Sequence, residues 1–241
     1  MEPFLLGLCK KIENTPVRPG HNDALRCDIQ EAYCYIRNRL RRGTGSRSEL
    51  SALEELCRKK MLEMDLASAR ISDRPPLSPV DIDYALSEFC DAFDIAAGSC
   101  GRRVECRCGG NGQMLVCCPE LVLKGTGFLI RYLMAAGFRA VCISTCFTAD
   151  YFLIRLHGSF RRPEGICAPP AAHSQELSAA HAVANRHSGS LIGLLSGEHA
   201  DPVFCLPLSL SADTAPPDVP EFSDYLCSRL SPVYTCLYGL N

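Results

Sequence analysis

The 241-residue sequence has few of the features that would commit a protein to a membrane, a nucleic acid or a metal ion. It contains no apolar run of about 18 residues or more, so it predicts no membrane-spanning helix. Its formal net charge of −2 predicts no broad attraction to nucleic acid or to anionic lipid. With 47% hydrophobic and 22% charged residues, the composition is that of a folded protein, which we expect in the cytoplasm.

Paired cysteines at the spacing of metal sites are also missing. The sequence has 16 cysteines, yet no two are spaced as C-x2-C, the usual thiolate pairing in zinc sites. Cys106 and Cys108 would share one face of a strand, but two thiolates alone are too few for such a site. The other cysteines are scattered through apolar stretches, where cysteine packs as a small hydrophobe. We therefore expect free thiols, no bound metal and no cofactor.

Residues 1–73 show the apolar spacing of a helical hairpin. A first stripe recurs every three or four residues, at Leu25, Ile29, Ala32, Ile36 and Leu40. Two glycines and two serines interrupt it between residues 41 and 48, and Ser46 with Glu49 makes a capping box for a second helix that continues to about Ser72. Because two helices with one stripe each leave apolar surface uncovered, we expect a homodimer in which two hairpins form a four-helix bundle.

Residues 77–208 alternate between helical and strand patterns, after a boundary marked by Pro75 and Pro76. We expect a helix that is capped by Ser78 or Asp81 and ends at Gly98, and further helices over 119–137 and 175–187. Strands are expected over 104–108, 114–117, 141–147, 151–156, 190–195 and 203–208, the first two as a hairpin. Three helices on one side of a mixed, mostly antiparallel sheet make a two-layer α/β sandwich, so the expected fold class of the chain is α+β. Residues 209–241 are expected to form a C-terminal extension with a short helix over 222–230.

The order of these elements, together with several motifs, resembles the dimerisation and ATP-binding domains of bacterial sensor histidine kinases. Residues 177–190, which include Asn185-Arg186-His187-Ser188-Gly189, resemble the family's helix after the ATP lid and its His-Gly-Gly-like turn. Phe204-Cys205-Leu206-Pro207-Leu208 resembles the family's last strand, and residues 66–71 with 77–82 resemble the join between the two domains. The resemblance implies a dimeric helical hairpin over 1–73 and an ATPase-type sandwich, of the GHKL class, over 77–208.

The position that would accept phosphate departs from the family pattern. The resemblance implies an acceptor histidine early in the first hairpin helix, before an acidic residue, and the matching position is Cys27, followed by Asp28. A thiol cannot form the phosphoramidate that imidazole forms, although it is nucleophilic as a thiolate. His21, six residues earlier, is the candidate for a displaced acceptor.

The positions that would bind the nucleotide depart as well. Aligned without gaps, the two asparagines implied for magnesium binding fall on Phe128 and Tyr132, which offer no suitable oxygen ligand. The adenine-binding aspartate is replaced by Gly158 or, one register over, by His157. Phe160 stands where a glycine would let the backbone approach the nucleotide.

The position of the ATP lid carries charge of the wrong sign. The lid glycines, which would present backbone amides to phosphate, map to residues 174–176, and Glu176 places a carboxylate there. The last glycine pair maps to residues 199–201 and is absent from the sequence. These departures predict a degenerate nucleotide pocket and favour a protein that is not an enzyme.

The function that the resemblance and its departures favour is that of a pseudokinase, a dimeric scaffold in two-component-type signalling. Its partner would be a protein, such as a response-regulator receiver or a kinase, and neither nucleic acid nor a membrane. Two alternatives stay open. One is a histidine phosphotransferase of a phosphorelay that uses His21, and the other is a divergent active histidine kinase.

Overall fold

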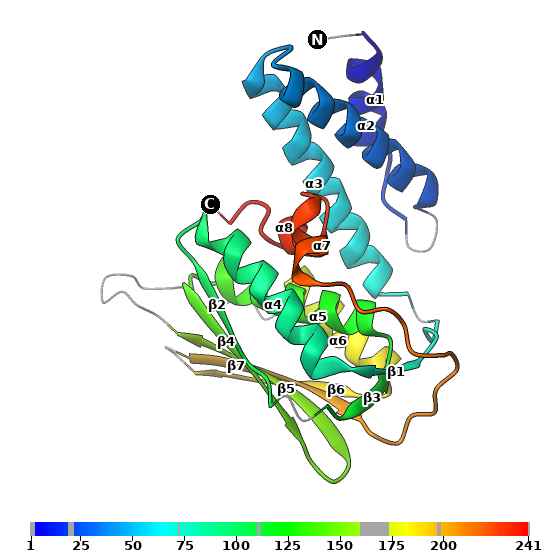
Figure 1. Cartoon of the computed structure of the whole chain (residues 1–241), viewed down its shortest axis with the longest axis vertical. Helices are drawn as coiled ribbons and strands as arrows, with labels where there is room; N and C mark the ends of the chain where they lie inside the picture. Colours follow the sequence, from blue (N-terminus) through cyan, green and yellow to red (C-terminus); the bar gives the residue numbers. More distant parts are fainter. Residues whose placement is uncertain are drawn as a thin grey trace. The chain divides into compact units, whose positions relative to one another are not determined.

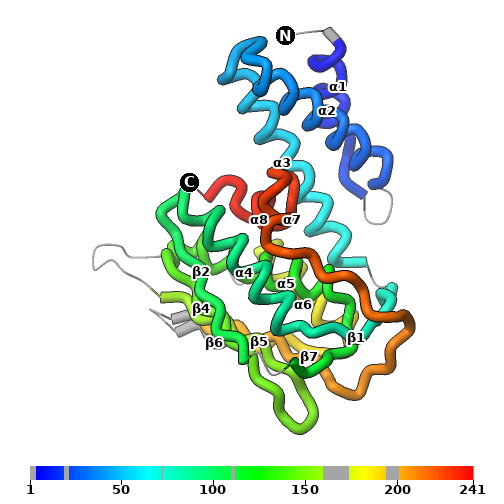
Figure 2. Tube along the Cα trace, viewed as in Figure 1, coloured from blue at the N-terminus to red at the C-terminus, as the bar shows by residue number. Residues whose placement is uncertain are grey.

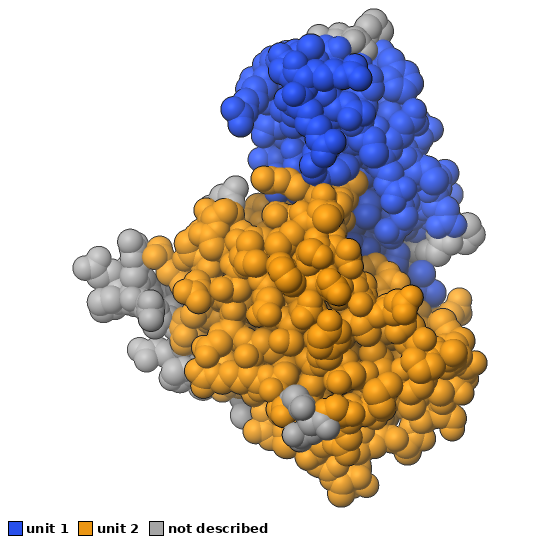
Figure 3. Space-filling model, in the orientation of Figure 1, with its two compact units in different colours: residues 1–71 blue, residues 72–241 orange. Residues whose placement is uncertain are grey.

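The computed structural model of the chain describes residues 3–18, 22–71, 73–109, 112–159, 174–196 and 199–240. They divide into two compact units, Met1–Ile71 and Ser72–Asn241, which Figure 3 shows in different colours. Within the described ranges, the helices are all too short or too polar to cross a bilayer.

The first unit contains three helices, α1 (Pro3–Asn14), α2 (Asp23–Arg42) and α3 (Arg47–Ala69). The predicted hairpin corresponds to α2 and α3. Gly43 ends α2 in the left-handed conformation (φ 65°), and the Ser46 side chain caps α3 by accepting a hydrogen bond from the Glu49 amide. The hairpin prediction did not include α1, whose Leu5, Leu8, Cys9 and Ile12 are buried.

Helix α1 changes the physical argument for a dimer, because it packs against both α2 and α3. A stripe that a third helix covers no longer needs a second copy of the chain to bury it. The stripe residues Ile29 and Ile36 of α2, and Cys57 and Met64 of α3, are fully buried. The apolar stripes therefore supply no argument for a homodimer.

The second unit is built on a five-stranded sheet with the order β2-β4-β5-β7-β6. Its strands are β2 (Arg103–Arg107), β4 (Ala140–Phe147), β5 (Tyr151–Ser159), β6 (Ser190–Ser196) and β7 (His199–Pro207). The pair β2–β4 is parallel and the other neighbours are antiparallel. A separate two-stranded antiparallel sheet pairs β1 (Ser78–Asp81) with β3 (Met114–Cys117).

Helices α4 (Ile82–Gly98), α5 (Pro119–Ala135) and α6 (Gln175–Arg186) cover one face of the sheet, as Figure 1 shows. Each begins at a residue suited to a helix start: Asp81 accepts a hydrogen bond from the Tyr84 amide, Pro119 takes the first helical position, and Ser174 accepts one from the Leu177 amide. Alternate strand residues face these helices and are buried, among them Val141, Ile143, Phe152, Ile154, Leu156 and Phe204. The predicted α+β fold class, a helical segment followed by a two-layer α/β sandwich, is confirmed.

The predicted hairpin of residues 104–108 and 114–117 is wrong. Those residues do form strands, but β2 pairs in parallel with β4, and β3 pairs with β1, which the sequence reasoning had read as the start of a helix. Two short strands around a glycine-rich loop are typical of a hairpin, yet the choice of partner is made by contacts far away in the chain. In β2, pairing with β4 sets Val104 beside Val141, and both are buried.

The C-terminal segment returns across the helical layer of the second unit. Its backbone is hydrogen-bonded to Leu77, the residue before β1. The Leu77 carbonyl accepts hydrogen bonds from the amides of Asp213 (2.7 Å) and Thr214 (3.1 Å). Figure 2 traces the segment, orange to red, to α7 (Phe222–Cys227) and α8 (Pro232–Cys236), which pack on α4 and α5. The expected helix over 222–230 is thus shorter, and a second short helix follows it.

Candidate functional site

Helix α5 carries the two positions at which the resemblance implied magnesium-binding asparagines. Phe128 is 1% exposed and Tyr132 is 3% exposed, so both side chains belong to the core. Burial raises the pKa of the Tyr132 hydroxyl, and that oxygen has no hydrogen-bond partner among the described residues. A protonated phenol in the core is not a ligand for magnesium, which prefers charged or carbonyl oxygens and water. Within the described ranges, no three His, Cys, Asp or Glu side chains are grouped so that they could hold a metal ion.

Arg131 lies between these two positions and connects three parts of the unit. Its Nε donates to Glu176 Oε1 of α6 at 3.0 Å, and its Nη1 donates to the backbone carbonyls of Cys236 (2.9 Å) and Tyr238. The Arg131 and Glu176 side chains are only 14% and 18% exposed. Glu176, the carboxylate that the sequence analysis placed at the lid position, is therefore paired with Arg131. Charge-assisted bonds in partly dry surroundings are the stronger ones, so this contact holds α5, α6 and the C-terminal segment together.

The C-terminal segment packs along the same stretch of α5. A Cβ added at Gly127 would lie 3.1 Å from Cys236 Sγ, so glycine allows a close approach of the segment to the helix there. At the far end of the helix, Arg102 donates to the carbonyl of Leu240 at 2.8 Å and to that of Met134. Two arginines therefore bind the segment by its backbone, which requires no particular side chain from residues 236–240.

The position of the adenine-binding aspartate lies on β5, where Gly158 is packed against an aromatic ring. A Cβ added at Gly158 would come within 2.8 Å of the Phe138 ring, so no aspartate fits at this position without displacing Phe138. The neighbouring His157 points to the other face of the sheet, where its Nδ1 lies 2.5 Å from Asp201 Oδ1 of β7. Asp201 belongs to the stretch to which the last glycine pair was mapped, so His157 and Asp201 are joined by a hydrogen bond across the two strands. Phe160 lies outside the described residues.

The two candidate phosphoacceptors are in the first unit. Cys27 is exposed on α2, beside Asp28, whose carboxylate is paired with Lys11 of α1 at 2.7 Å. His21 lies outside the described residues, so the structure adds nothing to its sequence-based candidacy. Of the predicted positions, Glu176 is joined to α5 through Arg131, three residues after Phe128 and one before Tyr132, whereas Gly158 lies on β5 against Phe138.

The motif that resembled the His-Gly-Gly-like turn is a packing element. The amide of Cys118, at the start of α5, donates to His187 Nε2 at 3.1 Å, so Nδ1 carries the ring proton and donates to the Val183 carbonyl at 2.8 Å. Burial lowers the pKa of His187, which is 0% exposed. A Cβ added at Gly189 would lie 2.1 Å from the Cys205 carbonyl oxygen, so only glycine fits. This turn joins α6 to α5 and to β7.

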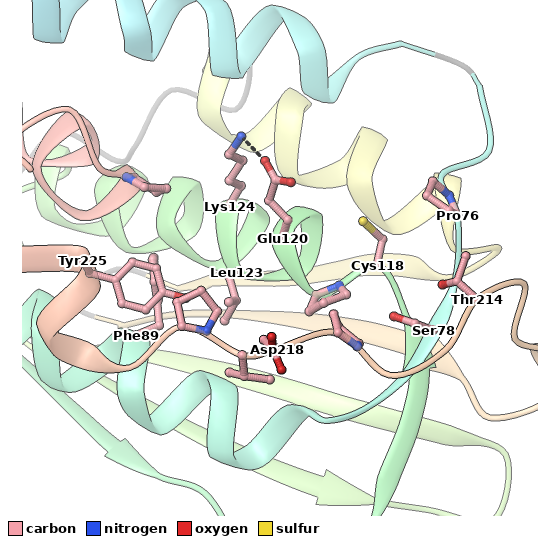
Figure 4. Close-up of a pocket in the computed structure, with 15 residues that line it drawn as sticks. Pro76, Ser78, Phe89, Cys118, Glu120, Leu123, Lys124, Thr214, Asp218 and Tyr225 are labelled. Carbon is pink, nitrogen blue, oxygen red and sulfur yellow. Dashed lines mark hydrogen bonds and ion pairs between the residues drawn. The ribbon is translucent and has the colours of Figure 1, made fainter. Parts of the chain in front are cut away.

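A pocket of about 470 Å³ opens elsewhere, between the start of α5 and the C-terminal segment. Figure 4 shows Phe89 and Tyr225 toward one end and Pro76, Ser78 and Thr214 toward the other, with Leu123 between them. The described nucleotide positions do not line it. The sequence did not predict this pocket, because one wall is a proline-rich stretch (Pro217 and Pro220) more than 80 residues beyond the end of α5. Pro76 and Pro119, which also line the pocket, were the residues in the sequence that could have pointed to it.

No family model matches the chain, and no curated protein matches it. Among solved structures, it is similar to the Acinetobacter baumannii histidine kinase AdeS, with a TM-score of 0.45, 13% identity, and coverage of 86% of this chain and 94% of that one. For the catalytic domain of the histidine kinase ThkA the TM-score is 0.47 and the identity 11%, over 56% of this chain and 97% of that one. For full-length ShkA in complex with AMPPNP the TM-score is 0.46 and the identity 15%, over 86% of this chain and 43% of that one. The first two are named as histidine kinases, the class that the motifs predicted, and the likeness assigns no role to any residue of this chain.

Proposed function

We propose that this protein is a pseudokinase, a histidine-kinase-like scaffold in two-component-type signalling that neither binds Mg-ATP nor transfers phosphate. The observation that supports this most is the occupation of the stretch of α5 where a nucleotide would bind. Phe128 and Tyr132 are in the core, and Arg131 is bonded to Glu176 and to the C-terminal backbone. A nucleotide would have to break these contacts and would find no carboxamide ligand for its magnesium ion.

The expected loss of affinity follows from the missing contacts. An aspartate that binds the adenine amine supplies a hydrogen bond to a charged group, which contributes about 1.5–3 kcal/mol. Gly158 cannot supply it, and its packing against Phe138 leaves no space for a side chain that could. Together with the lost magnesium ligand, this moves a micromolar site at least about a hundredfold, toward millimolar dissociation constants.

Titration calorimetry with millimolar Mg-ATP tests the proposal on the whole chain. We expect no binding tighter than about 1 mM. A dissociation constant below about 50 µM would overturn the pseudokinase proposal, because that is more than about 1.5 kcal/mol beyond what the remaining contacts can supply.

An Arg131→Ala variant sharpens the same measurement. It removes the bonds to Glu176 and to the C-terminal carbonyls, so it would expose any intact nucleotide site that the segment merely covers. Lys124→Ala is the matched control on the same helix, since Lys124 pairs with the exposed Glu120. We expect neither variant to bind. Binding by Arg131→Ala alone would mean an occluded active kinase instead of a pseudokinase.

For its partners, we propose a homodimer through the first unit and a protein such as a receiver or a kinase on the scaffold. The dimer is supported by large apolar side chains exposed on α1, Phe4 at 55% and Leu6 at 39%. Sedimentation at tens of micromolar should show a dimer that Leu6→Glu weakens, because a buried unpaired charge is costly. Ile95→Glu, at a similarly exposed position on α4, is the control that should leave the dimer intact. A monomeric wild type would contradict the proposal.

Phosphate transfer from a phosphorylated receiver separates the scaffold from the phosphorelay alternative. We expect no transfer to this chain. If the wild-type chain takes up labelled phosphate and the His21→Ala variant does not, the protein is a phosphotransferase and not a scaffold. Labelled phosphate on other residues would contradict both the scaffold and the phosphotransferase proposals.

A further inference from the structure

Two thiols at the end of β2 lie unusually close together. Cys106 is in β2 and Cys108 is one residue beyond it, and their sulfur atoms are 2.9 Å apart. A disulfide bond is about 2.05 Å long, so the two sulfurs are within about 1 Å of bonding distance. Both residues are half-buried, and both are free thiols in the structure. The alternation of a strand places residues two apart on the same face, which explains the approach.

The surroundings of the pair hold it in place from two sides. Cys90 of α4, 1% exposed, is within hydrogen-bond reach of Cys106 on the buried side. On the other side, the amide of Gly109 donates to Thr145 Oγ1 at 3.3 Å, and that hydroxyl donates to the buried Asp83 at 2.6 Å. The residue after Cys108 is thereby fixed to β4 and α4, so the pair is not part of a free loop.

Three neighbouring thiols could suggest a metal site, but the geometry does not favour one. In the part of the chain that the structure describes, no group of three His, Cys, Asp or Glu side chains is arranged to hold an ion. Two thiols in contact have a different chemistry available, which is two-electron oxidation. We propose that Cys106 and Cys108 form a reversible redox site, which a small disulfide such as oxidised glutathione converts into an intramolecular disulfide.

The reaction balances in two exchange steps. Cys108, at the end of the strand, loses its thiol proton and attacks one sulfur of the small disulfide. That S–S bond breaks, and the departing thiolate takes up a proton. The Cys106 thiolate then attacks the Cys108 sulfur, forming the Cys106–Cys108 bond and releasing the second small thiol. Two protein thiols lose two electrons in total, and one small disulfide becomes two thiols.

The environment sets the expected pH dependence of this oxidation. The hydrogen bond with Cys106 and burial both raise the pKa of Cys108 above that of an ordinary thiol. Because the thiolate is the attacking species, the rate should keep rising with pH beyond about 8.5, where an exposed cysteine levels off.

Peptide mass spectrometry on the whole chain tests the proposal. Reduced protein is incubated with oxidised glutathione, quenched with acid, alkylated and digested with trypsin. Cleavage after Arg107 separates the two cysteines, so their disulfide would join the peptide of residues 104–107 to that of residues 108–124. We expect this linked pair as the main product, its disappearance after addition of reduced glutathione, and its fragmentation to assign the bond to Cys108 instead of Cys117 or Cys118.

Serine variants supply the controls. Cys106→Ser and Cys108→Ser should each abolish the linked peptides, and Cys108→Ser keeps the whole of β2 intact if the former variant folds poorly. Cys142→Ser, which removes a half-buried thiol from the neighbouring β4, should leave the linkage unchanged. The proposal is overturned if wild-type protein carries only mixed disulfides with glutathione, or if the bonds join other cysteines. It does not depend on the pseudokinase proposal.

Discussion

Two parts of the second unit resembled histidine kinase motifs, and the structure gives them opposite characters. In the turn after α6, the residues that resemble the family, His187 and Gly189, have a structural reason to be as they are. On α5, Phe128 and Tyr132 depart from the family, and they are equally well explained by packing. The turn joins α6 to α5 and β7, whereas Phe128 and Tyr132 fill part of the core.

The difference shows which residues a fold itself requires. The turn needs glycine because a carbonyl oxygen occupies the space of a Cβ, and it needs a ring with one donor and one acceptor because two backbone groups are otherwise unpaired. The positions of Phe128 and Tyr132 meet no such demand from the surrounding backbone, and aromatic side chains fill the core there. A motif can therefore report a fold without reporting its chemistry.

Gly189→Ala tests the structural part most severely. The new Cβ would meet the Cys205 carbonyl oxygen at 2.1 Å, and backbone on both sides would have to move. We expect a loss of about 4 kcal/mol or more in the free energy of unfolding, measured by urea denaturation. Gly193→Ala, in β6 just after that turn, meets nothing within 4 Å among the described residues and should change stability by less than about 1 kcal/mol. Similar losses for both variants would refute the close approach.

Arg131→Met tests the ligand-side part. Removing the guanidinium leaves Glu176 and two carbonyls without their donor in a mostly buried place, so we expect a loss of about 2–3 kcal/mol. Combined with Glu176→Gln in a double-mutant cycle, the loss should be less than additive, because the two residues share one interaction. Lys124→Ala should cost less than about 1 kcal/mol, since Glu120 is 73% exposed. Additive losses would show that the ion pair does not contribute.

His187→Leu should cost about 2 kcal/mol, because the Cys118 amide and the Val183 carbonyl lose their partner. It should also remove a pH dependence. Burial lowers the pKa of His187 in the folded state, so below about pH 6.5 the unfolded chain binds a proton that the folded chain does not. The free energy of unfolding therefore decreases as the pH is lowered. Urea denaturation between pH 7 and 5 should show this decline in wild type and a weaker one in the variant. His181→Leu, exposed on the same helix, should keep the wild-type slope.

Gly158→Ala is expected to have the smallest effect, about 1–2 kcal/mol, because the Phe138 ring that it meets can tilt. A second change, Phe138→Leu, removes ring atoms from the contact, so Gly158→Ala should cost less in that background. Thermal denaturation of the four proteins gives both numbers. Equal costs in the two backgrounds would separate Gly158 from Phe138.

Much of this architecture could be predicted from local pattern. The spacing of apolar residues predicted α2 to α6, and helix-start chemistry at Ser46 placed the beginning of α3 to within a residue. For α4 the sequence left Ser78 and Asp81 open, and the structure caps the helix with Asp81. Helix α1 did not enter that prediction, although its Leu5, Leu8 and Ile12 have helical spacing. Helix α8 was missed because five residues show hardly more than one helical turn.

The sequence by itself determined the fold class, because the periodicity of apolar residues is a local property. Only the tertiary structure decided the partners. It paired β2 with β4, brought Arg131 to Glu176 across 45 residues, and laid residues 236–240 on α5. These pairings give buried polar groups their hydrogen-bond partners. The partners lie far away in the sequence, so a local stretch of residues does not reveal them.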